Sequence, residues 1–413
     1  MSRIMDLNQR YTRPDWVRRL NAMADSVGGA EQLIPIEGDA LVEIACTTTG
    51  LTDFGDVDGD WRGRFDSLVA SIAADARLHV VGRLMTRQEI LRGLRTRLLL
   101  AEARKQRPAI SEERIDAPIA ISGPARSGTS ILFELLALDP HGRGPLATEA
   151  NHPVPADGLD RATLVRMSEC EQELWTDVQP ELAAVHELRS DIPVECITLQ
   201  LPSFAGFHWP MVARVPGFAL DLAKAMDYHR AVLQTLQHTA TPEQAGRTWV
   251  LKTPIYLMAI DLLFDTYPDA WLIHTHRDPL KTLPSGISTA TLVRWLRSDH
   301  VDPDEYGGAY GTLLLLLGVI ERRKAADLEP RIIDSHFADL MAAPIASIEK
   351  IYDQMGREFL GEHADAIRAY LANKPKGKFG THRYSLEEWG IDAREARERS
   401  LPYTEHYGVK LEV

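Results

Sequence analysis

The pattern of hydrophobic and polar positions changes near residue 117. Before that point the chain has the spacing of amphipathic helices with arginine-rich polar faces. One apolar stripe comprises Ile90, Leu91, Leu94 and Leu98. Thr86 followed by Glu89 has the spacing of a capping box, so the sequence predicts that this helix begins at Thr86. We therefore expect residues 1–116 to form a helical N-terminal extension.

From residue 117 onward, short apolar runs alternate with helical segments. The pattern predicts these elements in chain order: 119–122 (strand), 129–138 (helix), 248–252 (strand), 255–267 (helix), 271–276 (strand) and a further strand at 331–334. Strands that alternate with helices in this way pair in parallel. We therefore predict an α/β domain at 117–413 whose parallel sheet is flanked by helices.

Composition excludes several classes of protein. The chain has 413 residues, 45% of them hydrophobic, so it can bury a large core. Its net charge of −13 argues against binding nucleic acid or an anionic membrane surface, and any anion site must be a local basic pocket. The three cysteines form no CxxC pair, which suits free thiols in a reducing compartment, and no apolar run is long enough to span a bilayer. We therefore expect a cytoplasmic protein, and the sequence leaves its oligomeric state open.

The segment GPARSGTS, residues 123–130, lies between a predicted strand and a predicted helix. Gly123 and Gly128 have the GxxxxG spacing of a phosphate-binding loop, in which backbone N–H groups and a helix start attract a phosphate. Nucleoside triphosphatases carry lysine where this chain has Thr129, whereas Arg126 supplies positive charge inside the loop. The pattern favours a metal-free anion site over a kinase or ATPase site, although such glycines also form simple turns.

A second cationic group follows the third predicted strand. Arg277 comes directly after 271–276, at the edge of the sheet where open α/β folds bind ligands, and Ser285 follows eight residues later. These two side chains are suited to flank one phosphate. The alternative is that Arg277 only forms a local ion pair with Asp278.

These motifs resemble those of the bacterial sulfotransferases that use 3′-phosphoadenosine 5′-phosphosulfate (PAPS). The stretch PARSGTS is similar to the family's loop for the 5′-phosphosulfate, TWVLKTPIYL to its second strand and the following helix start, and HTHRDP with Ser285 to its 3′-phosphate site. Looser similarity covers LTDFG at 51–55 and KFGTHRYSLEEWG at 378–390. The resemblance implies a P-loop-like sulfotransferase fold, and an enzyme that moves a sulfuryl group from PAPS to a hydroxyl or amine of a small, apolar acceptor.

The resemblance also implies roles for single residues. The 5′-phosphosulfate would be held by Arg126, Ser127, Gly128, Thr129 and Ser130. Lys252 would neutralise the departing phosphate oxygen, unless it is a solvated charge at a strand end. Arg277 and Ser285 would fix the 3′-phosphate. A basic run would close over it, with Lys376, Gly377 and Lys378 as its centre, unless that run is solvated surface. No metal ion is expected.

Three residues are candidates for the general base. Glu149 has a position similar to that of a catalytic glutamate in several members of the family, and His152 and His208 are the other candidates. Many relatives carry histidine where this chain has Tyr256, a departure that either strengthens Glu149 or puts the activity in doubt. A non-catalytic bisphosphate-binding scaffold protein is therefore the main alternative, and a nucleotide-dependent kinase is a lesser one.

Three further patterns are given structural roles. The apolar set Phe204, Phe207, Trp209, Met211 and Phe218 is predicted to be core in preference to an acceptor pocket. His274 and His276 alternate on one strand, but no cysteine or carboxylate set in the sequence completes a metal site. The run at 56–60, DVDGD, lacks the glycine and glutamate of a calcium loop, so we predict a solvated turn.

Overall fold

The centre of the molecule is a five-stranded parallel sheet with the order β2-β3-β1-β4-β5. The computed structural model describes residues 6–156, 158–302, 311–325, 327–374 and 382–412. The strands are β1 (Ile119–Ser122), β2 (Gly142–Arg143), β3 (Thr248–Lys252), β4 (Trp271–His276) and β5 (Ile332–His336). The predicted α/β class and parallel pairing are confirmed. The sequence does not predict strand β2, because two residues are too few to show an alternation of apolar and polar positions.

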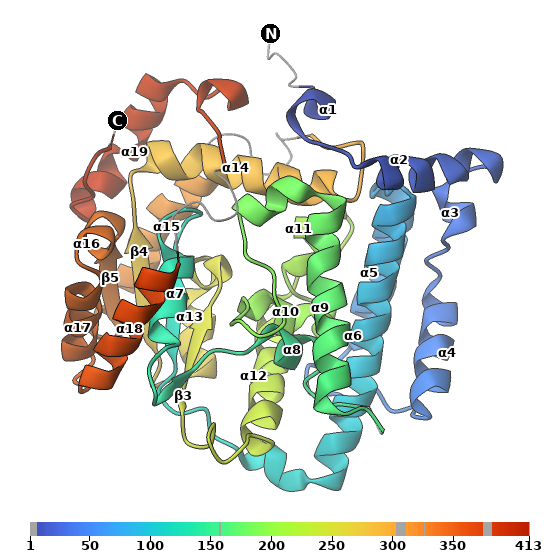
Figure 1. Ribbon diagram of the computed structural model, residues 1–413, viewed down its shortest axis with the longest axis horizontal. Coiled ribbons are helices and arrows are strands. Elements are labelled where there is room, and N and C mark those ends of the chain that lie inside the picture. Colours follow the sequence, from blue (N-terminus) through green and yellow to red (C-terminus); the bar gives the residue numbers. More distant parts are fainter. Residues whose placement is uncertain (1–5, 157, 303–310, 326, 375–381, 413) are drawn as a thin grey trace.

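Helices cover both faces of the sheet, because successive side chains of a strand point to opposite faces. In β1, Ile119 and Ile121 belong to one hydrophobic cluster and Ala120 to another. The first cluster is completed by α7 (Thr129–Leu136), α16 (Phe337–Ala342), α17 (Pro344–Gln354) and α18 (Gly361–Asn373). The second includes α10 (Cys196–Gln200), α12 (Leu222–His238) and α13 (Ile260–Thr266). Figure 1 shows α16 to α18 stacked together at one side of the strands.

The helix predicted at 255–267 is interrupted. The chain forms a 3₁₀ helix at Pro254–Met258, leaves helical geometry at Ala259, where φ is −147°, and then begins α13. Because proline lacks an N–H, Pro254 fits the first turn of such a helix. The helix predicted at 129–138 ends at Leu136.

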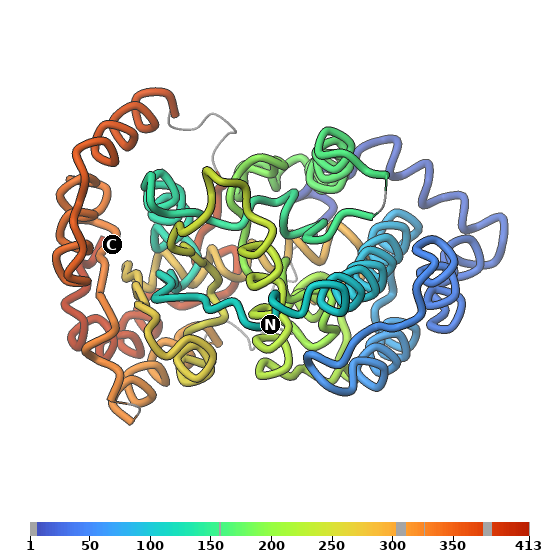
Figure 2. The backbone as a smooth tube through the Cα atoms, turned by 90° about the horizontal axis from the view of Figure 1, so that it is seen from below, coloured from blue at the N-terminus to red at the C-terminus, as the bar shows by residue number. Residues whose placement is uncertain are grey.

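The N-terminal part is helical, as predicted. It comprises α1 (Leu7–Arg10), α2 (Asp15–Ala22), α3 (Ala30–Leu33), α4 (Gly38–Thr49), α5 (Trp61–Asp75) and α6 (Val80–Gln106). Figures 1 and 2 both show α2 to α6 at the end of the molecule opposite α16 to α18.

The capping-box prediction at Thr86 is wrong. Helix α6 begins at Val80 and runs through Thr86 and Glu89, which are both buried. Their side chains face Arg297, whose guanidinium donates to Thr86 Oγ1 at 3.0 Å and to both Glu89 oxygens at 2.7 and 2.8 Å. The two residues with capping-box spacing therefore serve here as buried partners of Arg297.

The helices of the N-terminal part share a hydrophobic cluster with later segments. The cluster joins residues of α4 to α6 to residues 178–215 and to the end of α14 (Pro279–Trp295). Phe204 and Trp209 are among its buried members, and Met211 and Phe218 pack against it, so these four form core as predicted. The remaining α-helices are α8 (Ala147–Asn151), α9 (Arg161–Val178), α11 (His208–Val212), α15 (Gly311–Ala325) and α19 (Ala393–His406). Within the described ranges, no helix combines the length and the apolar character needed to cross a bilayer.

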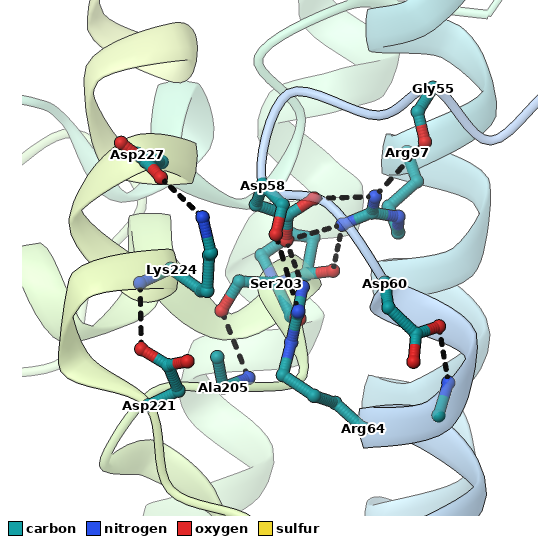
Figure 3. A network of polar contacts seen from close by, with 12 residues as sticks. Gly55, Asp58, Asp60, Arg64, Arg97, Ser203, Ala205, Asp221, Lys224 and Asp227 are labelled. Carbon is teal, nitrogen blue, oxygen red and sulfur yellow. Dashed lines mark hydrogen bonds and ion pairs between the residues drawn. The ribbon is translucent and has the colours of Figure 1, made fainter.

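The turn at 56–60 is not simply solvated, which corrects the prediction. Asp58 is fully buried and pairs with two buried arginines, Arg64 at 2.6 Å and Arg97 at 2.8 Å. Figure 3 shows how Asp58 reaches between the helix that carries Arg97 and the segment around Ser203. Asp60 is the N-cap of α5, because its side chain accepts a hydrogen bond from the Gly63 N–H. The acidic run therefore joins α5, α6 and the segment near 203.

Replacing Asp58 tests this interior ion pair. Asp58→Asn keeps the shape of the side chain but leaves two buried guanidinium groups without a countercharge. We expect the free energy of unfolding, measured by urea denaturation, to fall by about 3 kcal/mol. The exposed Asp56 offers a matched control, and Asp56→Asn should change stability by less than about 0.5 kcal/mol. Equal stabilities of the two variants would contradict the interpretation.

Candidate functional site

The loop at 123–128 joins β1 to α7 at the carboxyl edge of the sheet. Arg126 and Gly128 both have left-handed backbone conformations, with φ of 65° and 93°. Gly128 is the N-cap of α7. Because glycine has no side chain, no N-cap side chain accepts a hydrogen bond from the first N–H groups of the helix. Such a helix start attracts an anion through its N–H groups and its dipole.

The loop is held against β4 by a buried pair of hydroxyls. Ser127 Oγ lies 2.6 Å from Thr275 Oγ1 and donates to the Pro124 carbonyl at 2.7 Å. Any side chain at Gly123 would overlap the Thr275 hydroxyl and approach Ser127 Oγ within 2.8 Å. Glycine at 123 is therefore required by the close approach of loop and strand. The Ser127 hydroxyl is engaged inside the loop, whereas Thr129 and Ser130 begin α7.

Lys252, at the carboxyl end of β3, lies beside the loop. Only 4% of it is exposed, and its ammonium donates to Ser130 Oγ at 3.3 Å. It also forms a close ion pair with Glu195, the N-cap residue of α10. The alternative that Lys252 is a solvated charge at a strand end is therefore wrong. The side chain is buried and is paired with Glu195 beside the start of α7.

Glu195 is a functional candidate that sequence reasoning missed. Its segment reaches the site because Val194 N–H donates to the Pro145 carbonyl at 2.8 Å and Pro193 bridges Leu146. No motif marks Glu195, and the only signal available was a carboxylate directly before a short helix. Its contact with Lys252 spans 57 positions of sequence, so only the fold brings the two together.

The charges around Glu195 keep it ionised. Burial acts to raise the pKa of Glu195, but the Lys252 ammonium outweighs it, and the pKa lies below its ordinary value of 4.5. The pKa of His186 is lowered, first by burial and also by Lys252 and Arg126. A carboxylate, an ammonium and a neutral imidazole therefore lie together beside the loop.

Arg277 begins the second part of the site, at the carboxyl end of β4. Its Nη1 donates to the Arg126 carbonyl at 2.9 Å, and its guanidinium stacks 3.9 Å from the centre of the Phe337 ring. The predicted alternative, an ion pair with Asp278, is wrong: Asp278 binds Arg397, and Arg277 binds Glu412. The arginine therefore contacts the loop and is fixed in orientation.

Ser285 lies in α14 and is completely buried. Among the described residues, no group forms a hydrogen bond with its hydroxyl. A buried hydroxyl without a partner costs free energy, so it is suited to a ligand oxygen. An unpartnered hydroxyl is compatible with the prediction that Ser285 and Arg277 hold one anionic group, and that role stays a prediction.

The basic run at the C-terminal side falls partly outside the described residues, and so do Lys376, Gly377 and Lys378. The residues on either side are described. Lys374 donates to Glu134 Oε2 of α7 at 2.6 Å, and His382 Nε2 lies 2.9 Å from Ser288 Oγ of α14. Burial lowers the pKa of His382 to about 4, with Arg126 as the next contributor. Both flanks of the run therefore contact helices that carry site residues.

The three base candidates from the sequence have other partners. Glu149 accepts from Arg143 at 2.7 Å and from the Leu146 N–H at 3.0 Å. His152 pairs with Glu171 at 3.2 Å, and His208 lies 3.0 Å from Glu89 in the N-terminal core. Among the described residues, none of the three forms a hydrogen bond or ion pair with Lys252 or with the loop. Their catalytic roles remain predictions, and the structure adds Glu195 as a further candidate for the base.

Tyr256 is not suited to act as a base in place of the histidine that many relatives carry at this position. Its ring is buried in the cluster behind β3, and burial raises the pKa of its hydroxyl well above 10.0. A phenol of that kind keeps its proton at neutral pH and is a poor base.

The histidines of β4 do meet a carboxylate, which corrects the sequence interpretation. His274, His276 and Asp334 bring ligand atoms within 4.8 Å of one another, the carboxylate coming from the neighbouring strand β5. Arg323 also enters this cluster, 2.6 Å from Asp334 Oδ1 and 3.2 Å from His274 Nδ1. Because a guanidinium already neutralises the carboxylate, the cluster is best described as an ion pair between the buried Arg323 and the exposed Asp334, with two buried histidines beside it.

A family model described as "Sulfotransferase family" matches residues 118–361. Among curated proteins, omega-hydroxy-beta-dihydromenaquinone-9 sulfotransferase Stf3 of Mycobacterium bovis is 25% identical over 292 residues, which cover 67% of this chain and 72% of the relative. The protein of the same name from Mycobacterium tuberculosis matches to the same extent.

Two solved structures resemble most of the chain. Sulfotransferase STF1 of Mycobacterium tuberculosis H37Rv superimposes with a TM-score of 0.70 and 27% identity, covering 89% of this chain and 99% of its own. Sulfotransferase STF9 of Mycobacterium avium gives a TM-score of 0.71 at 23% identity, covering 91% and 97%. The second likeness concerns the fold alone.

The contact at Gly123 gives a direct test of the loop. In Gly123→Ala the new methyl group overlaps the Thr275 hydroxyl, so the loop must move away from β4. We expect the affinity for adenosine 3′,5′-bisphosphate, measured by titration calorimetry, to fall by more than about tenfold. We also expect a loss of about 1–3 kcal/mol in stability. Gly361→Ala is the control, because a methyl group there meets nothing within 4 Å. Wild-type affinity in Gly123→Ala would contradict this account of the loop.

Proposed function

Since the chain belongs to the sulfotransferase family, we propose that it transfers a sulfuryl group from PAPS to a hydroxyl or amine of a small, apolar acceptor. The observation that supports this most strongly is the convergence of three cationic residues on one loop. Arg126 lies within it, Arg277 donates to its carbonyl, and Lys252 donates to Ser130 where the loop enters α7. These contacts form two cationic positions suited to the two phosphate-bearing ends of PAPS.

The residues fit this donor in both parts of the site. The uncapped start of α7 and Arg126 are suited to the 5′-phosphosulfate, which carries less charge than a triphosphate and so does not require the usual lysine. The unpartnered Ser285 hydroxyl and the stacked Arg277 are suited to the 3′-phosphate. We expect no metal requirement, because these cations supply the positive charge.

Two residues beside the loop fit the chemical step. In the transfer, the acceptor oxygen bonds to sulfur while the bond from sulfur to the 5′-phosphate oxygen breaks. We propose that Lys252 stabilises the negative charge on that leaving oxygen and that Glu195 takes the proton of the acceptor hydroxyl. In this proposal Glu195 acts in place of Glu149, because Glu195 contacts Lys252 whereas Glu149 is paired with Arg143.

The support for an apolar acceptor comes from a relative of the chain. The relative Stf3 is named for a hydroxylated dihydromenaquinone, at 25% identity to this chain. Phe204 and Trp209 are core residues and give no support to an acceptor pocket at 204–218. We retain a small, apolar acceptor as the proposal, and a non-catalytic bisphosphate-binding protein as the alternative that the next experiment excludes or supports.

Lys252→Ala tests whether the protein is a catalyst. With labelled PAPS and a panel of hydroxyl and amine acceptors, wild type should transfer label and Lys252→Ala should lower kcat by about 10²–10³-fold. Binding of adenosine 3′,5′-bisphosphate should change little. Lys350→Ala removes an exposed lysine of α17 and should leave both quantities unchanged. Tight bisphosphate binding by wild type without transfer to any acceptor would support the scaffold protein instead.

Glu195→Gln tests the base. We expect kcat to fall by about 10²–10⁴-fold, whereas the matched Glu149→Gln should retain most activity. Although burial opposes it, Lys252 keeps the pKa of Glu195 below 4.5, so the carboxylate stays ionised as the pH falls from about 8 to about 6. The wild-type kcat/KM should therefore show no acidic decline in that window. Loss of activity in Glu149→Gln with retention in Glu195→Gln would assign the base to Glu149.

A further inference from the structure

Each of the three guanidinium nitrogens of Arg277 already donates one hydrogen bond. Its Nε and Nη2 donate to the two carboxylate oxygens of Glu412 at 2.7 and 2.8 Å, and Nη1 donates to the Arg126 carbonyl. The side chain of Arg277 is 15% exposed and that of Glu412 is 28% exposed. The Nε and Nη2 edge is one with which arginine binds carboxylate or phosphate in a bidentate manner.

Glu412 is held in place by its own backbone. Its N–H donates to Asp278 Oδ2 at 2.7 Å, and Asp278 is fixed in turn by two bonds of 2.8 Å from Arg397 of α19. Three residues earlier, Val409 is buried with Leu316 and Tyr403. The segment after α19 is therefore anchored at Val409 and at the backbone of Glu412 itself, and the carboxylate lies on Arg277 as a defined contact.

We propose that Glu412 is a specificity-determining residue of the donor site, in which its carboxylate competes with the 3′-phosphate of the donor for Arg277. This inference rests on the proposed function, because it takes Arg277 as the 3′-phosphate ligand. A dianionic phosphate that takes the Nε and Nη2 edge displaces the carboxylate. A phosphate that takes another edge lies close to it and is repelled. In both cases Glu412 weakens binding of a 3′-phosphorylated nucleotide and leaves a nucleotide without that phosphate unaffected.

The competing explanation predicts the opposite sign. If Glu412 served only to orient Arg277 for the phosphate, its removal would loosen the guanidinium and weaken binding of the bisphosphate. Orientation does not depend on Glu412 alone, because Arg277 also stacks on Phe337 and donates to the loop. We therefore expect competition to outweigh orientation.

The test is a set of calorimetric titrations with adenosine 3′,5′-bisphosphate and adenosine 5′-monophosphate. Glu412→Gln removes the charge, keeps the size of the side chain and retains the backbone contact with Asp278. We expect it to tighten binding of the bisphosphate by about tenfold and to leave the monophosphate unchanged. Glu405→Gln, at an exposed position of α19, removes the same charge from the same region and should alter neither affinity.

The outcomes separate this inference from the proposed function. If wild type prefers the bisphosphate but Glu412→Gln binds it equally or more weakly, the competition is refuted and the donor site stands. If Glu412→Gln and Glu405→Gln tighten binding equally, the effect is one of general charge and the assignment to Glu412 is overturned. If neither wild type nor Glu412→Gln distinguishes the bisphosphate from the monophosphate, the donor site itself is refuted, and the inference with it.

Discussion

Strand β1 pairs in parallel with β3 on one side and with β4 on the other, and this pairing determines where the cationic groups of the site lie. Because parallel strands end at the same edge, the phosphate-binding loop, Lys252 and Arg277 all emerge there. The register aligns Lys252 with Ile121, near the end of β1, and the lysine side chain reaches Ser130 where the loop enters α7. A shift of one strand by a residue would turn Lys252 to the other face of the sheet.

The site also solves an electrostatic problem of an acidic chain. With a net charge of −13, the protein repels a polyanionic donor at long range, so the cations must act at close range in a buried setting. Lys252 and Arg277 are both largely shielded from solvent, and each is paired with a carboxylate, Glu195 or Glu412. Paired charges can be kept buried at much lower cost than isolated ones. The same two carboxylates are the groups to which the proposals assign proton transfer and donor selectivity.

The sequence predicts the parts of this arrangement that are local. The strands at 119–122, 248–252 and 271–276 each depend on a few consecutive residues, and these predictions are confirmed. The glycines of the loop lie between β1 and α7 as expected, and phosphate binding by the loop stays a prediction. Contacts between distant segments leave no such pattern. Glu195 reaches Lys252 across 57 positions and Glu412 reaches Arg277 across 135, and neither residue belongs to a motif. Asp58 and Glu89 lie in motifs that usually indicate turns or helix starts, yet both serve here as buried partners of arginine.

The most direct test of the account is the position of adenosine 3′,5′-bisphosphate in a crystal of the protein. We predict that its 5′-phosphate lies within hydrogen-bond distance of the backbone N–H groups at the start of α7, and that its 3′-phosphate contacts Arg277 and the Ser285 hydroxyl. A bound molecule with its two phosphates exchanged, or one placed away from residues 123–130, would contradict the account.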